Sequence, residues 1–369
     1  MKIGIVTYWF SEENYGQLLQ CYALQRYLRD KGYDAFLVLI REKTNSSQGK
    51  LNEILSKIKT VVGSPLSSIG ELKNKINKVR YAQNYPVSRK FSTFIRDHIK
   101  TTSSEYTVEN LYRNPPEADL FICGSDQIWG GYYWFYYLDF VPQGIRKMSY
   151  AASFGGMNDF TIEYKAKLIK LLQQFNFLSL REKSGVEFCH KLGFENALKM
   201  PDPTLLLNRA EYDEIREDFP VDGKYVLLYL LGNKISMKVK EVFNYAQSKG
   251  LNVIYIASQD RYDKYRKDFP TIGQWVDLIA KAELVVTNSF HGTVFSAMYH
   301  KPFIVIPLIG SHSRMNTRID DFLSESQLKN RIYKGHITEL AQKEVDFTVF
   351  EKIKASWNTC VEQKFLKAL

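Results

Sequence analysis

Short, mostly apolar segments alternate with longer amphipathic segments along most of this 369-residue chain. The short segments have the length and character of strands in a buried parallel sheet. The longer segments repeat apolar residues at the spacing of helices that cover one face of such a sheet. This alternation predicts an α/β protein with mainly parallel strands.

The alternation falls into two sets separated by Pro201-Asp202-Pro203, where two prolines interrupt regular structure. In the first set, strands are expected at 2–8, 35–40, 118–123, 147–152 and 177–180, with helices at 17–31, 163–174 and 184–192. In the second set, strands are expected at 225–231, 252–257, 284–287 and 303–306, with helices at 238–248, 274–281 and 293–299.

We therefore predict two Rossmann-like doubly wound domains, over 1–204 and 205–369, that face a cleft. This is the arrangement of GT-B-type transferases. The last helix is a candidate for packing back on the first domain. Residues 45–115 are polar, basic and helix-prone, with a break at Gly63-Ser64-Pro65, and are predicted to form a helical insertion in the first domain.

Positive charge is concentrated in one segment. The chain has 50 Lys and Arg against 40 Asp and Glu, whereas residues 41–100 alone have 13 against 4. This segment has no nucleic-acid-binding motif and no regular aromatic interleaving, so nucleic acid is not expected as a partner. Two interpretations stay open: a solvated helical excursion, or a basic surface in peripheral contact with anionic lipid headgroups or a lipid-linked acidic glycan.

Other features indicate a cytoplasmic setting. No apolar run approaches the roughly 20 residues that cross a bilayer, and no signal peptide is recognisable at the start of the sequence. The four cysteines are widely spaced without a C-x-x-C pair, which argues against a disulfide framework or a zinc site. We expect a cytoplasmic protein, with the inner face of the membrane as the alternative. No cofactor or metal-ligand cluster is predicted, although assistance by a soluble divalent ion stays open.

The sharpest candidate site is Leu284-Val285-Val286-Thr287-Asn288-Ser289-Phe290-His291-Gly292-Thr293. An apolar strand ends there in a polar turn, and a helix begins at once. Backbone N–H groups near Gly292 and Thr293 would form an anion site, and Asn288 and Ser289 in the same turn are further substrate-binding candidates. His291 can donate to a phosphate or exchange a proton near neutral pH. The alternative is a histidine that caps the turn and packs on the sheet.

Two other predicted strand ends carry charged groups. Arg181 follows strand 177–180 and offers a planar fork for a carboxylate or phosphate, unless it only pairs with Glu182 in solvent. Asp126 follows strand 118–123 and is a candidate general base for a hydroxyl nucleophile, or alternatively a helix cap.

Weaker candidates lie at two more loops. Asn14 and Gly16 stand between the first strand and first helix, where glycine permits close approach of a ligand and asparagine can cap the helix. Arg314 and Arg318 follow strand 303–306 and are candidates to close over an anion, or are ordinary surface arginines.

Several of these motifs together resemble the polysaccharide pyruvyl transferase family. The resemblance covers most of the chain and is carried by Asn14-Tyr15-Gly16, Gly124-Ser125-Asp126-Gln127-Ile128-Trp129, Arg181-Glu182-Lys183-Ser184, Pro201-Asp202-Pro203-Thr204 and, most specifically, Thr287-Asn288-Ser289-Phe290-His291-Gly292-Thr293. It implies a GT-B-like fold and transfer of pyruvate from phosphoenolpyruvate to two hydroxyls of one sugar. The product would be a pyruvate ketal on a surface glycan or its precursor, so the expected partners are phosphoenolpyruvate and a sugar or lipid-linked glycan acceptor.

The resemblance also implies roles for individual residues. His291 matches the family's histidine at the phosphoenolpyruvate site, and Arg181 matches an arginine thought to grip this donor. Members often carry an arginine two places before the histidine, where this chain has Ser289. We therefore expect Arg314 or Arg318 to supply the missing cation, unless the substrate differs. By the same resemblance, the first domain is expected on the acceptor side and the second on the donor side.

The candidate residues can supply the acid, the base and the cations that transfer of pyruvate from phosphoenolpyruvate would need. His291 is expected to be the acid or phosphate ligand, Asp126 the base, and Arg181 with the helix start at Gly292 the anion clamp. Two alternatives remain. One is a GT-B glycosyltransferase that uses a nucleotide sugar, with a diphosphate grip at Gly232-Asn233-Lys234. The other is a non-catalytic glycan-binding protein.

Overall fold

The structure is a computed structural model of the whole chain. It describes residues 1–11, 13–41, 89–131, 133–157, 160–232, 234–258, 261, 263–310, 313 and 316–369. Most of the basic segment 41–100, the greater part of the predicted insertion 45–115, Asn233 and Arg314 lie outside the described residues.

The first domain is built on a parallel sheet. Its core has the order β2 (Asp34–Leu37), β1 (Lys2–Val6), β5 (Leu120–Cys123), β6 (Arg146–Ser149). Short bridges continue it from β6 to β7 (Ser179–Leu180), and β7 pairs in parallel with β8 (Leu198–Lys199). The flanking helices are α1 (Tyr15–Asp30), α6 (Ile162–Leu172) and α7 (Lys183–Lys191). Because the strands are parallel, their carboxyl ends all reach the same edge of the sheet.

Helix α1 covers most of the predicted segment 17–31, and capping groups mark both of its ends. The side chain of Asn14 accepts a hydrogen bond from the backbone N–H of Gln17, which caps the first turn. After the last turn, Gly32 adopts a φ of 86°, a left-handed conformation that glycine takes without strain. The helix is buried along most of its length, because one side covers the first sheet and its beginning contacts the second domain.

Residues 89–113 are part of the first domain rather than a separate excursion. They form α4 (Phe91–His98), β4 (Tyr106–Thr107), which pairs with β3 (Ile40–Arg41), and α5 (Val108–Arg113). Phe91 and Phe94 on α4 are buried in the same apolar cluster as α1. The predicted insertion therefore extends too far at its C-terminal end, because these apolar side chains anchor the segment to the domain.

The second domain repeats the parallel architecture with the strand order β10 (Asn252–Ile256), β9 (Tyr225–Tyr229), β11 (Leu284–Thr287), β12 (Phe303–Val305). Its helices are α8 (Arg209–Asp213), α9 (Val239–Ser248), α10 (Ile272–Lys281), α11 (Phe290–Met298), α12 (Thr317–Glu325) and α13 (Ile337–Gln342). Strands β9 and β11 are buried over their whole length, as expected of central strands covered on both faces.

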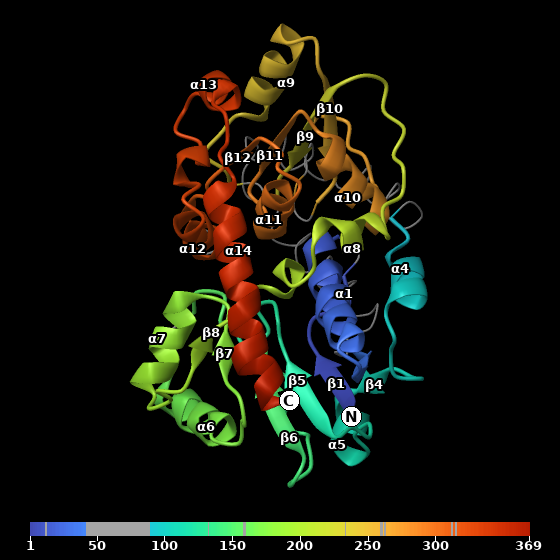
Figure 1. Cartoon of the computed structure of the whole chain (residues 1–369), viewed down its shortest axis with the longest axis vertical. Coiled ribbons are helices and arrows are strands. Elements are labelled where there is room, and N and C mark those ends of the chain that lie inside the picture. Colours follow the sequence, from blue (N-terminus) through green and yellow to red (C-terminus); the bar gives the residue numbers. More distant parts are fainter. Residues whose placement is uncertain are drawn as a thin grey trace, which may run out of the picture.

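The two domains are joined by apolar contacts and by the end of the chain (Figure 1). Tyr15 on α1 stacks on Trp275 of α10 with ring centroids 5.5 Å apart, and its hydroxyl donates to the carbonyl of Pro270 at 2.9 Å. Helix α14 (Thr348–Cys360) runs from the second domain towards the first and continues as a π-helical turn, η5 (Val361–Leu366). There Phe365 packs on Tyr150, at a centroid distance of 4.6 Å.

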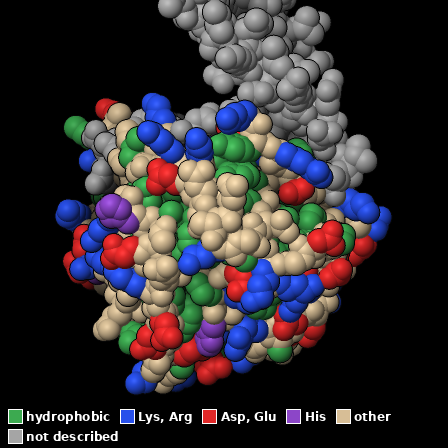
Figure 2. Space-filling model, turned by 90° about the horizontal axis from the view of Figure 1, so that it is seen from above, with side chains coloured by type: hydrophobic (Ala, Val, Ile, Leu, Met, Phe, Trp, Pro, Cys, Tyr) green, Lys and Arg blue, Asp and Glu red, His purple; other side chains and the backbone are tan. Residues whose placement is uncertain are grey.

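The described surface shows no large region of one charge on the face in Figure 2, where acidic and basic side chains are interspersed. Among the helices that the structure describes, none has the length and apolar character needed to span a membrane.

Candidate active site

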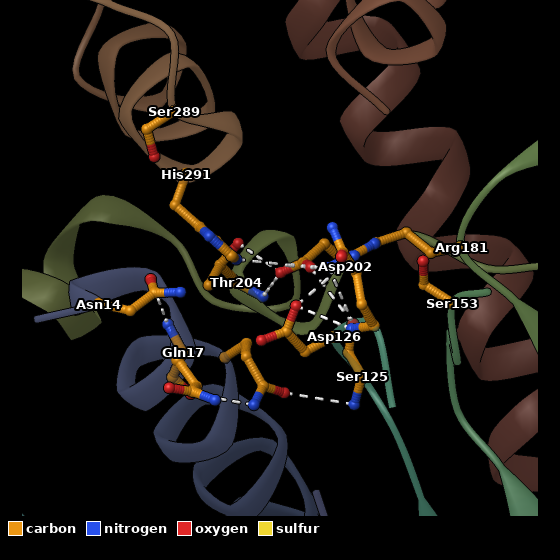
Figure 3. A network of polar contacts seen from close by, with 12 residues as sticks. Asn14, Gln17, Ser125, Asp126, Ser153, Arg181, Asp202, Thr204, Ser289 and His291 are labelled. Carbon is orange, nitrogen blue, oxygen red and sulfur yellow. Dashed lines mark hydrogen bonds and ion pairs between the residues drawn. The ribbon is translucent and has the colours of Figure 1, made fainter. Parts of the chain in front are cut away.

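Polar side chains from both domains meet where the carboxyl ends of the first sheet face the start of α11 (Figure 3). Ser125, Ser153 and Arg181 follow β5, β6 and β7, whereas His291 lies in the first turn of α11. Asp202 lies in the segment between the two sheets. Such an edge is where ligands bind in parallel α/β folds.

Asp202 is the centre of this cluster. Its Oδ2 lies 2.8 Å from Nη1 of Arg181 and 3.6 Å from Nε2 of His291, and it accepts a hydrogen bond from the hydroxyl of Ser125 at 3.3 Å. Its Oδ1 accepts from the backbone N–H and hydroxyl of Thr204 at 3.0 and 2.8 Å. Burial raises the pKa of Asp202, but His291 and Arg181 outweigh burial and hold that pKa well below its usual range. Asp202 is therefore a buried carboxylate.

Arg181 is held by carboxylates on several sides, with only 3% of its side chain exposed. Besides Asp202, its Nε donates to Oε1 of Glu182 at 3.1 Å, and its Nη2 lies 3.8 Å from Oδ1 of Asp126. Burial lowers the pKa of Arg181, but Glu182, Asp202 and Asp126 outweigh it and raise the pKa above its usual range. Arg181 is therefore buried and does not merely pair with Glu182 in solvent. Its Nη2 makes no hydrogen bond to the described residues.

Arg318 is a second guanidinium beside this cluster. Burial, with Arg181 nearby, lowers the pKa of Arg318 to about 10. With the amide oxygen of Gln127 turned towards it, Gln127 accepts from its Nη1 at 3.0 Å and its Nε at 3.3 Å. In the part of the chain that the structure describes, no carboxylate oxygen lies within 4.0 Å of Arg318. Among the described residues, Arg318 therefore has a positive charge without a direct ion pair, next to Arg181.

His291 is packed between the domains, with 5% of its surface exposed. Its ring lies against Gly16 on α1, where an added β-carbon would be 1.9 Å from Nδ1. Its Nε2 faces Asp202 and has no hydrogen-bond partner among the described residues. Gly16 therefore makes room for the imidazole of His291, which occupies the place where we predicted a ligand.

This contact predicts that Gly16→Ala will disturb the site. The new methyl group would overlap the imidazole, so we expect at least a tenfold loss of activity and a destabilisation of about 1–3 kcal/mol. Enzyme assays and urea unfolding would measure both effects. Gly185→Ala on α7 is the matched control, because its β-carbon would meet Leu180 at 3.4 Å, an ordinary contact.

The turn before α11 is closed by its own hydrogen bonds. The hydroxyl of Ser289 accepts from the N–H of Gly292 at 3.2 Å, and the N–H of Thr293 donates to the carbonyl of Ser289 at 3.0 Å. The side chain of Asn288 bonds to the N–H and carbonyl of Leu231 at 2.7 and 2.9 Å. The predicted anion site on the amides of Gly292 and Thr293 is therefore wrong. These residues fix the turn that places His291.

The loop after β5 carries Asp126 in a left-handed conformation, with a φ of 65°. Its backbone carbonyl accepts from the N–H of Ser153 at 3.1 Å, which ties this loop to the loop after β6. Its Oδ1 accepts from the N–H of Gln127 at 2.8 Å. Positive φ at a residue with a side chain costs free energy and is concentrated at functional sites. Asp126 belongs to the cluster because its Oδ1 lies 3.8 Å from Nη2 of Arg181, and 11% of its side chain is exposed.

Sequence reasoning missed several members of the cluster. Glu182 was considered only as a solvent partner of Arg181, but it is buried and also accepts from the hydroxyl of Ser153 at 2.7 Å. Asp202 was noted only within a chain break and within one motif of the family resemblance, and no role was predicted for its carboxylate. A carboxylate between two prolines, soon after a short strand, was the signal that could have found it. No group of three or more His, Cys, Asp or Glu suited to a metal ion occurs among the described residues.

Comparison with known families decides the classification. The sequence model for polysaccharide pyruvyl transferase matches residues 14–308, which include every motif that carries the resemblance. The chain belongs to the polysaccharide pyruvyl transferase family. The predicted family is confirmed, and it is a family of transferases that act on glycans. No curated protein matches the chain significantly by sequence.

Comparison with solved structures shows the fold of this family member. UDP-N-acetylglucosamine 2-epimerase from Rickettsia bellii aligns with a TM-score of 0.50 and 12% identity over 100% of this chain and 96% of that one. A Methanocaldococcus jannaschii UDP-GlcNAc 2-epimerase in complex with UDP-GlcNAc and UDP aligns with a TM-score of 0.48 and 12% identity over 98% and 99%. At this identity the likeness of the first structure shows the fold alone, and the predicted GT-B-like fold is confirmed.

Proposed function

We propose that this protein transfers pyruvate from phosphoenolpyruvate to two hydroxyls of one sugar, in a surface glycan or its precursor, and forms a cyclic ketal. The observation that carries the proposal is a pair of buried nitrogen atoms without hydrogen-bond partners at the junction of the domains. These are Nε2 of His291 and Nη2 of Arg181, for which the described residues offer no hydrogen-bond partner. Leaving such groups unpaired costs free energy, which an anionic ligand would recover.

The reaction requires a proton donor, a proton acceptor and cations. The methylene carbon of phosphoenolpyruvate takes up a proton, and C2 becomes oxocarbenium-like. One sugar hydroxyl forms a bond to C2 and loses its proton, after which the bond from C2 to the phosphate oxygen breaks. The second hydroxyl then attacks C2 and loses its proton. The balanced products are the ketal and inorganic phosphate.

The cluster contains side chains suited to each of these requirements. His291 is proposed as the proton donor or phosphate ligand, and Asp126 as the base that accepts a hydroxyl proton. Arg181 and Arg318 are proposed to hold the carboxylate and phosphate of the donor. Arg318 is the better candidate for the cation that family members carry at the position of Ser289, because no carboxylate within 4.0 Å in the described residues neutralises it.

Release of inorganic phosphate from phosphoenolpyruvate is the direct test. We expect release that depends on an added sugar or lipid-linked sugar, and a product with the mass of a pyruvate ketal. Thermal shift measurements with phosphoenolpyruvate and with nucleotide sugars serve as the parallel assay. Stabilisation by nucleotide sugars alone, without phosphate release for any acceptor, would contradict the proposal and favour a glycosyltransferase.

A further inference from the structure

A cavity of about 320 Å³ opens between the domains, beside the cluster of Arg181 and Asp202. It is lined by one side of α12, by the loops that follow β7 and β8, and by residues of α14. Its volume is at the lower end of the range of small-molecule sites, roughly 300–1,000 Å³. The functional roles proposed above leave most of its lining residues unused.

One wall of the cavity is aromatic. Phe290, Phe322 and Trp357 come from α11, α12 and α14, and all three line it. The ring centroids of Phe290 and Phe322 are 6.2 Å apart, and those of Phe322 and Trp357 are 6.3 Å apart. Contacts between successive rings make a continuous apolar surface. Such a surface suits a ligand with one apolar face.

The remaining lining is polar, with carboxylates in excess. Three cations line the cavity together with four carboxylates, and Lys199 pairs with Glu325 across the two domains. Glu182 uses only Oε1, and Asp321 uses only Oδ2, which accepts from the N–H of Lys183 at 3.2 Å. The second oxygen of each carboxylate has no hydrogen-bond partner among the described residues.

This balance of charge discriminates between the two substrates of the proposed reaction. Arg181 and Arg318 line the cavity and are proposed above to hold phosphoenolpyruvate, which leaves Lys199 as the third cation against four carboxylates. This remaining part of the lining would repel a second anionic ligand. A neutral ring with many hydroxyls would instead donate to the unused carboxylate oxygens. Its apolar face would pack on the aromatic wall.

We propose that the cavity is the acceptor subsite and binds one pyranose ring. In this assignment Trp357 and Phe322 lie against the face of the ring, and Asp321 and Glu182 accept hydrogen bonds from its hydroxyl groups. This assignment rests on the proposed function. Arg181 and Arg318 also line this cavity and are proposed to hold the donor, so the two substrates would lie side by side.

Direct binding of simple sugars tests the subsite without turnover. Saturation-transfer NMR on the whole protein would use methyl glycosides of galactose, glucose, mannose and N-acetylglucosamine at tens of millimolar. We expect at least one of them to give signals, and Trp357→Ala and Asp321→Asn each to weaken binding at least fivefold. Asp321→Asn is nearly isosteric, so it tests the contact even if loss of the indole disturbs folding. Phe243→Ala on α9 removes an aromatic side chain that does not line the cavity, and should leave the signals unchanged.

Each outcome decides the assignment. Absence of signals for every sugar, or equal signals in wild type and in both cavity variants, would overturn it. Binding of phosphoenolpyruvate, measured by calorimetry, should be unchanged in Asp321→Asn, and a large loss there would overturn the assignment of Asp321 to the acceptor sugar. Sugar binding at this place without any phosphate release would contradict the proposed reaction but leave the sugar subsite standing.

Discussion

His291→Ala is expected to lower acceptor-dependent phosphate release from phosphoenolpyruvate by about 10²–10⁴-fold, the usual effect of removing a positioned acid or base. The reason is geometric. His291 brings its Nε2, which has no hydrogen-bond partner among the described residues, from the second domain to within 3.6 Å of the carboxylate of Asp202, and that carboxylate also pairs with Arg181. Steady-state kinetics with saturating acceptor would measure the loss, which we expect mainly in kcat.

Two controls separate this role from packing. His300→Ala removes a partly exposed imidazole that pairs with Glu351, and should leave the rate unchanged. In the His291→Ala background, Gly16→Ala should cost no further activity, because the ring that its methyl group would strike is gone. If His291→Ala folds normally and keeps more than about a tenth of the wild-type rate, the proposed role is wrong.

Asp202→Asn is expected to be the most destabilising single change in the site, by about 3–5 kcal/mol, because it removes the charge that compensates a buried guanidinium. The asparagine keeps the shape and the contacts with Thr204, so the loss reports charge rather than volume. Urea unfolding at pH 7 would measure it. Asp97→Asn provides the comparison, since Asp97 pairs with Arg96 on the surface and its replacement should leave stability essentially unchanged.

The effect of Asp202 should also depend on pH, in a direction that follows from its lowered pKa. The unfolded chain binds a proton at this carboxyl near its ordinary pKa of about 3.9, whereas the folded protein binds it only at much lower pH. The stabilising contribution is therefore complete above about pH 5 and declines as the pH falls. The difference in stability between wild type and Asp202→Asn should narrow over the same interval. A difference that stays constant from pH 7 down to pH 3 would show that Asp202 does not act through its charge.

Local pattern was sufficient for most of the architecture. The apolar run 284–287 is a strand with the predicted bounds, and the amphipathic segment 17–31 is helix Tyr15–Asp30. Both depend on features within a few residues, namely apolar spacing and capping side chains. The strand ends predicted Asp126 and Arg181 as candidates in the first domain and His291 as a candidate in the second. The structure brings Arg181 within 3.8 Å of Asp126, and both Arg181 and His291 lie beside Asp202.

Contacts between distant segments could not be predicted in this way. Nothing near Gly16 in the sequence indicates that an imidazole 275 residues later packs on it. The amides of Gly292 and Thr293 looked free because helix starts leave donors unpaired, yet the hydroxyl and carbonyl of Ser289 use them. Asp202 shows its role only when three chain segments meet around it.

Asp202 lies in the connection between the two sheets and contacts a side chain from each domain. Its Oδ2 lies 2.8 Å from Nη1 of Arg181 in the first domain and 3.6 Å from Nε2 of His291 in the second. A single carboxylate therefore couples the two halves of the molecule electrostatically. Neutralising it removes a contact between the domains as well as one within the first domain.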